Sequence, residues 1–266
     1  MTKQFFPVVA IASLVATIFS GSAHAQDDCD AACQAARNAQ DPLAPVTALF
    51  SDNTIGYGPN DEDTTYNFQV QGATTIETEA GNLIVRGILP FLGKPDDPLA
   101  KDLGAGDVIG QFFWVPHAEP GAFKIGFGPQ FSLKTRDTKL GGPGNGAGIA
   151  VVGFGFAGDL SYGGILGHLW GEDDFSVSTI QPIVFYNLEN FLGGSYIGYN
   201  NSVTYNWNTE KGLEGWTVPV GLTLGKTWPL DNGGAFDVSL GGYAMAAKPD
   251  GANESQFKFS FNYFFP

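Results

Sequence analysis

The C-terminal segment from Gln256 to Phe265 alternates strictly between aromatic and polar side chains. The aromatic residues occupy its odd positions: Phe257, Phe259, Phe261, Tyr263 and Phe265. Successive side chains of a β-strand point to opposite faces, so this segment predicts a strand with one apolar and one polar face. A soluble β-sandwich strand also alternates, but its core seldom needs such a row of aromatic residues. The pattern is typical of a strand in a transmembrane β-barrel.

The N-terminus has the features of a secretory signal peptide. Lys3 supplies the positive charge, residues 5–19 form a short apolar run, and residues 23–25 read Ala-His-Ala, a small-residue cleavage site. The run is too short for a membrane-spanning helix. We expect residues 1–25 to be removed and the mature chain to begin at Gln26.

A leader, residues 26–47, precedes the first predicted strand. Residues 31–40 are good helix formers and are followed by two prolines. The leader is expected to be a short periplasmic helix or a partial plug of the barrel mouth, and a disordered segment is the alternative. Cys29 and Cys33, the only cysteines, are candidates for a short-range disulfide in an oxidising compartment. A metal site there would need more ligands.

From residue 48 to residue 266 the sequence reads as strands separated by turn residues. We predict an antiparallel up-and-down β-barrel of about twelve strands, because segments of about ten alternating residues follow one another throughout. The expected strands are 48–57, 64–75, 82–92, 105–116, 122–134, 147–157, 160–170, 176–188, 194–207, 216–228, 235–247 and 255–265.

The strand expected at 216–228 shows best why a membrane is favoured. Trp216 and Trp228 bracket an aliphatic middle, as aromatic girdles bracket the hydrocarbon layer. A packed soluble core would instead place large aromatic residues in mid-strand. The predicted girdle residues are Trp216, Trp228, Phe257, Tyr263 and Phe265.

Charge excludes one class of partner. The full chain has a formal net charge of −14, whereas binding to nucleic acid requires an excess of Lys and Arg. Many acidic residues fall in the predicted loops. They could bind divalent cations that bridge lipopolysaccharide, although acidic clusters usually only solvate a surface.

Catalytic chemistry has little support. The mature chain has two histidines, His117 in a turn and His168 late in a strand, and no serine beside a recognisable oxyanion hole. We therefore expect no enzyme, no cofactor and no metal centre. Polar residues on inferred inward faces are the better candidates for a functional site, either lining a path or filling a closed lumen. They are Arg86, Lys124, Gln130, Lys134, His168 and Asp237.

Several short motifs occur together in one order. They are Asn53-Thr54 followed by Gly58-Pro59, then 126–131 (GFGPQF), 181–188 (QPIVFYNL), 216–221 (WTVPVG) and the terminal Phe264-Phe265-Pro266. As a set they resemble bacterial outer-membrane proteins often labelled "neuromedin U", which are similar to transporter-like barrels of meta-pathway phenol degradation. The resemblance covers the chain from about residue 41 and departs from the family at Gly167-His168, where paired amides are expected. It implies an outer-membrane β-barrel and a passive transporter.

The sequence thus predicts an outer-membrane channel for small solutes, hydrophobic or aromatic ones among them. Its expected partners are outer-membrane lipid, lipopolysaccharide and the barrel assembly machinery. The alternatives are a non-conducting barrel with a structural or surface role and a secreted soluble β-protein that binds a ligand.

Overall fold

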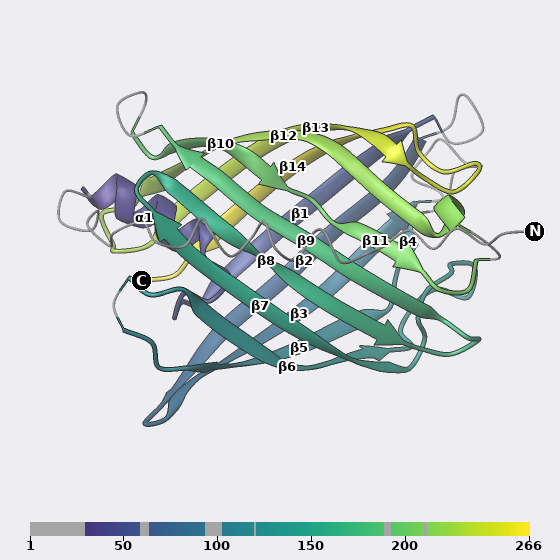
Figure 1. Cartoon of the computed structure of the whole chain (residues 1–266), viewed down its shortest axis with the longest axis horizontal. Coiled ribbons are helices and arrows are strands. Elements are labelled where there is room, and N and C mark those ends of the chain that lie inside the picture. The colour runs from purple at the N-terminus through teal and green to yellow at the C-terminus, as the bar shows by residue number, and fades with distance from the viewer. Residues whose placement is uncertain (1–29, 59–63, 94–102, 120, 189–192, 210–211) are drawn as a thin grey trace, which may run out of the picture.

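The computed structural model describes residues 30–58, 64–93, 103–119, 121–188, 193–209 and 212–266. Within these ranges the chain forms a short N-terminal helix and one antiparallel sheet that closes on itself (Figure 1). The predicted signal peptide and Cys29 lie outside the described residues. The predicted disulfide therefore stays a prediction, and Cys33 lies buried in the helix.

Strands follow one another along the whole chain after the helix. The elements are α1 (Ala31–Gln40), β1 (Ala48–Tyr57), β2 (Thr64–Thr78), β3 (Gly81–Gly93), β4 (Gly104–Ala105), β5 (Val108–Pro116), β6 (Lys124–Leu133), β7 (Gly146–Ala157), β8 (Leu160–Trp170), β9 (Ser176–Asn187), β10 (Ser195–Asn200), β11 (Val203–Asn206), the 3₁₀ turn η4 (Gly212–Gly215), β12 (Trp216–Pro229), β13 (Ala235–Ala247) and β14 (Ser255–Phe264).

The sheet is a closed barrel of twelve staves, where a stave is one strand, or two strand pieces in line, that runs from one rim to the other. β1 pairs with β2 on one side and with β14 on the other, which closes the ring. β10 and β11 both pair with β9 and β12, so they are two pieces of one interrupted stave. β4 only pairs with the end of β3. The predicted antiparallel barrel of about twelve strands is confirmed.

The outer face of the barrel is apolar. Along β12, Val220, Leu222 and Leu224 are 57–58% exposed, while Thr223 and Thr227, which point inward, are buried. The aromatic residues Phe257 and Phe261 of β14 are also exposed on the outside. They are not interleaved between two stacked sheets, so the soluble sandwich is excluded. A closed sheet leaves no unpaired edge strand, which is what a strand-built protein in hydrocarbon requires.

Helix α1 lies at the end of the barrel where the C-terminus also lies (Figure 1). Asp30 caps the helix by accepting a hydrogen bond from the Cys33 amide at 2.8 Å. The Arg37 guanidinium donates to the Gly158 carbonyl at 3.1 Å, and Gln40 donates to the Asn187 side chain at 2.7 Å. These bonds attach the helix to turns and strand ends at the same rim, which we call the α1 rim.

Candidate functional site in the barrel lumen

Apolar side chains fill much of the lumen near the α1 rim, beside buried polar residues such as Thr227 and Asp237. Inward residues of several strands form one buried cluster, and Leu43, which follows the helix, inserts into it. Phe154 is 0% exposed and Leu43 only 2%. The other members are Ile84, Phe113, Val115, Ala150, Val152, Ile165, Ile183, Phe185 and Tyr196. The leader therefore contributes directly to the packing inside the barrel.

An ion pair fixes the leader next to Leu43. Asp41 accepts hydrogen bonds from the Lys124 ammonium at the start of β6 and from the Leu43 amide, the latter at 2.8 Å. Burial raises the pKa of the Asp41 carboxyl, and the neighbouring Lys124 only partly opposes that shift. Lys124, predicted to face the lumen, thus lies at the α1 rim and binds the leader.

At mid-height the lining of the lumen changes to amides and charges. The Arg86 guanidinium of β3 donates to Gln71 Oε1, with Nε at 3.1 Å, and more weakly to Gln111 Oε1. Gln111 in turn donates to Gln130 at 3.0 Å, and Gln130 donates to the His168 carbonyl. Among the described residues, no carboxylate lies within ion-pair distance of Arg86. The charge of Arg86 is thus solvated by neutral amides.

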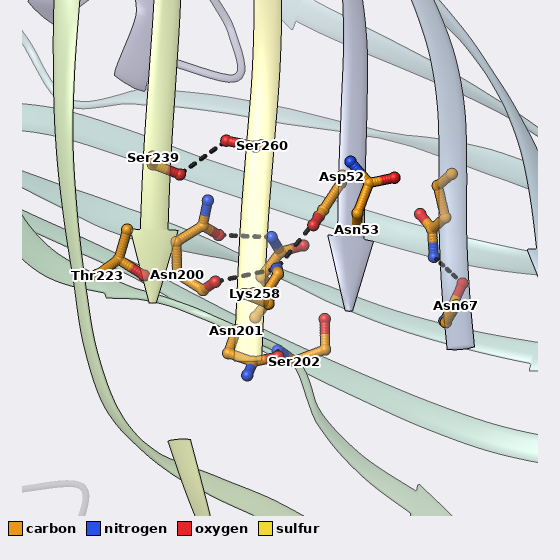
Figure 2. Close-up of polar contacts among 12 residues, drawn as sticks. Asp52, Asn53, Asn67, Asn200, Asn201, Ser202, Thr223, Ser239, Lys258 and Ser260 are labelled. Atoms are coloured by element: carbon orange, nitrogen blue, oxygen red, sulfur yellow. Dashed lines mark hydrogen bonds and ion pairs between the residues drawn. The ribbon is translucent and has the colours of Figure 1, made fainter. Parts of the chain in front are cut away.

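A second charged group faces the lumen from β1 and β14 (Figure 2). Lys258 Nζ lies 3.1 Å from Asp52 Oδ2 and donates to the Asn200 carbonyl at 3.2 Å. Asn200 ends β10, where the stave is interrupted before β11 begins at Val203. The following residue, Asn201, is buried and donates to Gln256 of β14 at 3.2 Å. The interruption thus brings the end of β10 into contact with β14.

A cavity of about 150 Å³ joins these two environments. Apolar side chains of the cluster line one part of it, and Arg86, Lys258, Asp52 and Asn200 line the other. Asp237 also faces this cavity, but it accepts hydrogen bonds from Tyr196, Thr227 and Asn262, each at 2.9 Å. The cavity therefore has an apolar part and a polar part, in which Arg86 and Lys258 stand among the carboxylates of Asp41, Asp52 and Asp237. Small-molecule sites are commonly built this way.

Four of the six candidate lumen residues point inward. Arg86, Gln130 and Asp237 line the interior, and Lys124 lies at its α1 rim. Lys134 follows the last residue of β6, its side chain is 51% exposed and it pairs with Glu172 at 2.5 Å, so it lies at the opposite rim.

Sequence reasoning missed Asp52 and Asn200, and it left out Lys258 although Lys258 stands on the polar side of the C-terminal alternation.

His168 is a correction, because it lies on the outer face of the barrel. It pairs in register with Ile149, which is 61% exposed, and shares its face with Leu166 and Trp170. Its Nδ1 lies 2.8 Å from Ser178 Oγ, and its ring centroid lies 4.2 Å from that of Trp170. The prediction was wrong because β8 carries apolar residues on both faces, so alternation gave no direction.

Aromatic residues mark both ends of the outer face. Trp228 stacks with Phe236, and Tyr263 packs on Phe265, all near the α1 rim. Trp216 packs on Tyr205 near the opposite rim, and Phe257 is exposed in the same half. The five predicted girdle residues thus lie near the ends of outward-facing strand segments. No group of His, Cys, Asp and Glu among the described residues is arranged to hold a metal ion.

A closed antiparallel ring with an apolar outside, aromatic residues near both ends and a partly polar lumen defines a membrane-spanning β-barrel. Solved structures share this fold. An outer membrane channel from Pseudomonas putida F1 matches with a TM-score of 0.57 and 11% identity, over 83% of this chain and 94% of that one. The NanC porin matches with a TM-score of 0.54 and 10% identity, over 83% of this chain and 99% of that one.

At such identities the likeness establishes the fold, which is that of outer-membrane β-barrel channels. Comparison of the sequence with protein-family profiles finds no match, and comparison with curated proteins finds none either.

Proposed function

We propose that this protein is a bacterial outer-membrane channel for the passive passage of small solutes, hydrophobic or aromatic ones among them. The observation that carries the proposal is the cavity inside a closed barrel, lined by apolar side chains on one part and by Arg86 and Lys258 on the other. The channel fold of the two solved structures and the resemblance to the "neuromedin U" barrels support the same function.

In this proposal residues 26–47 are a periplasmic leader that partly plugs the channel, and residues 48–266 are the barrel. The α1 rim then faces the periplasm, and the opposite rim faces the medium and lipopolysaccharide. Burial of Leu43 and the Lys124–Asp41 ion pair support a plug that is held in place rather than a loose leader. Insertion by the barrel assembly machinery belongs to the same proposal.

The test is conductance of purified protein in planar bilayers, combined with swelling of liposomes in small neutral solutes. We expect discrete current steps and swelling. Absence of both for the intact protein and for a variant without residues 26–45 contradicts a channel. Heat-modifiable migration on a gel confirms that each preparation is folded.

A non-conducting barrel is the second candidate, and one observation favours it. The apolar cluster with Leu43 fills much of the lumen near the α1 rim. If the variant without residues 26–45 is folded and still impermeable, the second candidate replaces the first, because the strands themselves then close the lumen. If this variant conducts, the leader is a plug of a channel.

A further inference from the structure

We infer that the cavity is a binding site for small monocarboxylates with an apolar body, whose carboxylate is held by Arg86 and Lys258. This inference names the solute class of the proposed channel and so rests on that function. An aromatic acid of one ring is the simplest member of the class. Its ring contacts the apolar part of the cavity, and its carboxylate replaces water at the two cationic side chains.

The first support is the state of Arg86. Its guanidinium makes hydrogen bonds to the side-chain oxygens of Gln71 and Gln111, and both of these residues are buried. Neutral amides orient a guanidinium without neutralising its charge. Arginine is suited to carboxylate recognition because its planar donors match two carboxylate oxygens. The protein thus presents an oriented cation to the cavity, and among the described residues no carboxylate forms an ion pair with it.

The charge of Asp52 also acts on Arg86, but it offsets only one of the two positive charges of Arg86 and Lys258. Asp52 lies 3.1 Å from Lys258 and pairs with it, so the three groups Arg86, Lys258 and Asp52 together keep one net positive charge. The two other acidic residues that line the cavity already have protein partners. Asp237 accepts three hydrogen bonds from protein donors, and Asp41 pairs with Lys124. These contacts favour an anion near Arg86 over a cation.

The apolar part of the cavity decides which anions fit. Ile84, Phe113, Val152 and Phe185 line it and offer a surface that suits an apolar body better than a sugar or an inorganic ion. The volume of about 150 Å³ is also small. An engineered apolar cavity of about the same size in another protein accommodates benzene. One ring with one carboxylate therefore matches both the size and the polarity.

The experiment is equilibrium binding to the full-length protein in detergent, measured by calorimetry with benzoate, benzyl alcohol and benzylamine. We expect benzoate to bind at least about tenfold more tightly than either other probe. Arg86→Gln is expected to weaken benzoate at least about tenfold and to leave benzyl alcohol within about twofold. Arg86→Lys is expected to restore part of the loss.

Lys139→Gln is the matched control, because it removes one positive charge from an exposed loop residue outside the cavity. It is expected to leave benzoate binding unchanged. If Arg86→Gln does not fold, Lys258→Gln tests the same site from another strand and is expected to weaken benzoate as well. Equal affinities for the three probes, or unchanged benzoate binding in the folded Arg86 or Lys258 variant, would overturn the inference.

Measurements of binding and of permeation together distinguish the proposed carboxylate site from the proposed channel. Benzoate that binds to a protein without conductance supports the site and counts against the channel. A protein that conducts small solutes and does not discriminate benzoate from benzyl alcohol keeps the channel and overturns the carboxylate site.

Discussion

The two halves of the lumen are built from different side chains although they belong to the same staves. Near the α1 rim most inward residues are apolar and packed, as at Phe154 and Leu43, and the polar ones, such as Asp237, are buried. Beyond mid-height they are amides, hydroxyls and charges, as at Gln130 and Lys258. Apolar packing inside a barrel stabilises the fold, whereas a hydrogen-bonded polar lining is suited to water and polar ligands. We therefore expect the half near the α1 rim to stabilise the barrel and close its lumen, and the polar half to select among solutes.

Phe154→Ala has the largest expected effect and tests whether the apolar half stabilises the barrel more than the polar half does. Phe154 is fully buried, so the truncation should lower the free energy of unfolding by about 3–5 kcal/mol. Asn67→Ala, on the polar half of β2 and exposed, should change it by less than about 0.5 kcal/mol. Urea titration of protein refolded into lipid vesicles measures both. Equal losses for the two variants would mean that the halves do not differ in their contribution to stability.

Leu43→Ala tests whether the apolar half also closes the channel. The change removes a buried side chain from the cluster and should weaken docking of the leader by about 2–4 kcal/mol. We expect more frequent or larger openings in planar bilayers. Gln34→Ala, on an exposed position of α1, is the control and should behave as the unmodified protein. An unchanged opening frequency for Leu43→Ala would show that the docked leader is not the gate.

Much of the barrel could be predicted from the sequence because the lipid and the lumen impose opposite polarity on alternate residues. The predicted strands 48–57 and 160–170 coincide with β1 and β8, and the predicted 176–188 differs from β9 by one residue. The interruption at Asn201–Ser202 was not predictable in the same way. It lies inside a single predicted strand, 194–207, and depends on contacts with β14 that are distant in sequence.

The site was predictable only in part, and the apolar half explains why. There the inward face is as apolar as the outward face, so polarity does not tell the two apart. Ile165 and Leu166 of β8 illustrate this: the first is 7% exposed and points inward, the second is 55% exposed and points outward. His168 was misplaced for that reason. In β6 the alternation is clear, and Gln130 was placed on the correct face. Arg86 was also placed correctly, as the one charged residue of β3, which is otherwise mostly apolar on both faces.

Asp107→Asn tests how the polar end of the barrel is held. Asp107 accepts hydrogen bonds from the amides of Gly144, Thr135 and Arg136 and pairs with the Arg136 guanidinium at 2.5 Å. Burial by itself raises the pKa of Asp107, but these bonds outweigh it and the net pKa is lowered. The carboxylate thus stabilises the loop above its ordinary pKa, near 3.8, and this contribution is lost as pH falls through the lowered pKa.

Asp107→Asn should lower the free energy that opposes local opening of the loop of residues 134–145 by about 1–2 kcal/mol. Trypsin cleavage after Arg136 and Lys139 should then become several-fold faster. Asp137→Asn, an exposed neighbour, is the control. The urea midpoint of the barrel should stay unchanged, because the apolar half determines it. A large drop in that midpoint would contradict the division between the two halves.

Asp52→Asn has the smallest expected effect and examines selectivity alone. The change removes the negative charge beside Lys258, so the net charge of the group formed by Arg86, Lys258 and Asp52 rises by one. In a water-filled channel, one charge at this level should alter the ratio of anion to cation permeability by roughly two- to fivefold, through an interaction of about 1 kcal/mol or less. The reversal potential in a salt gradient should move toward the equilibrium potential of the anion, and this shift should become smaller at high ionic strength. Asp174→Asn makes the same change of net charge on an exposed loop and should leave the reversal potential where it was. If the two variants shift it equally, the ions sense the overall charge of the protein rather than the polar half of the lumen.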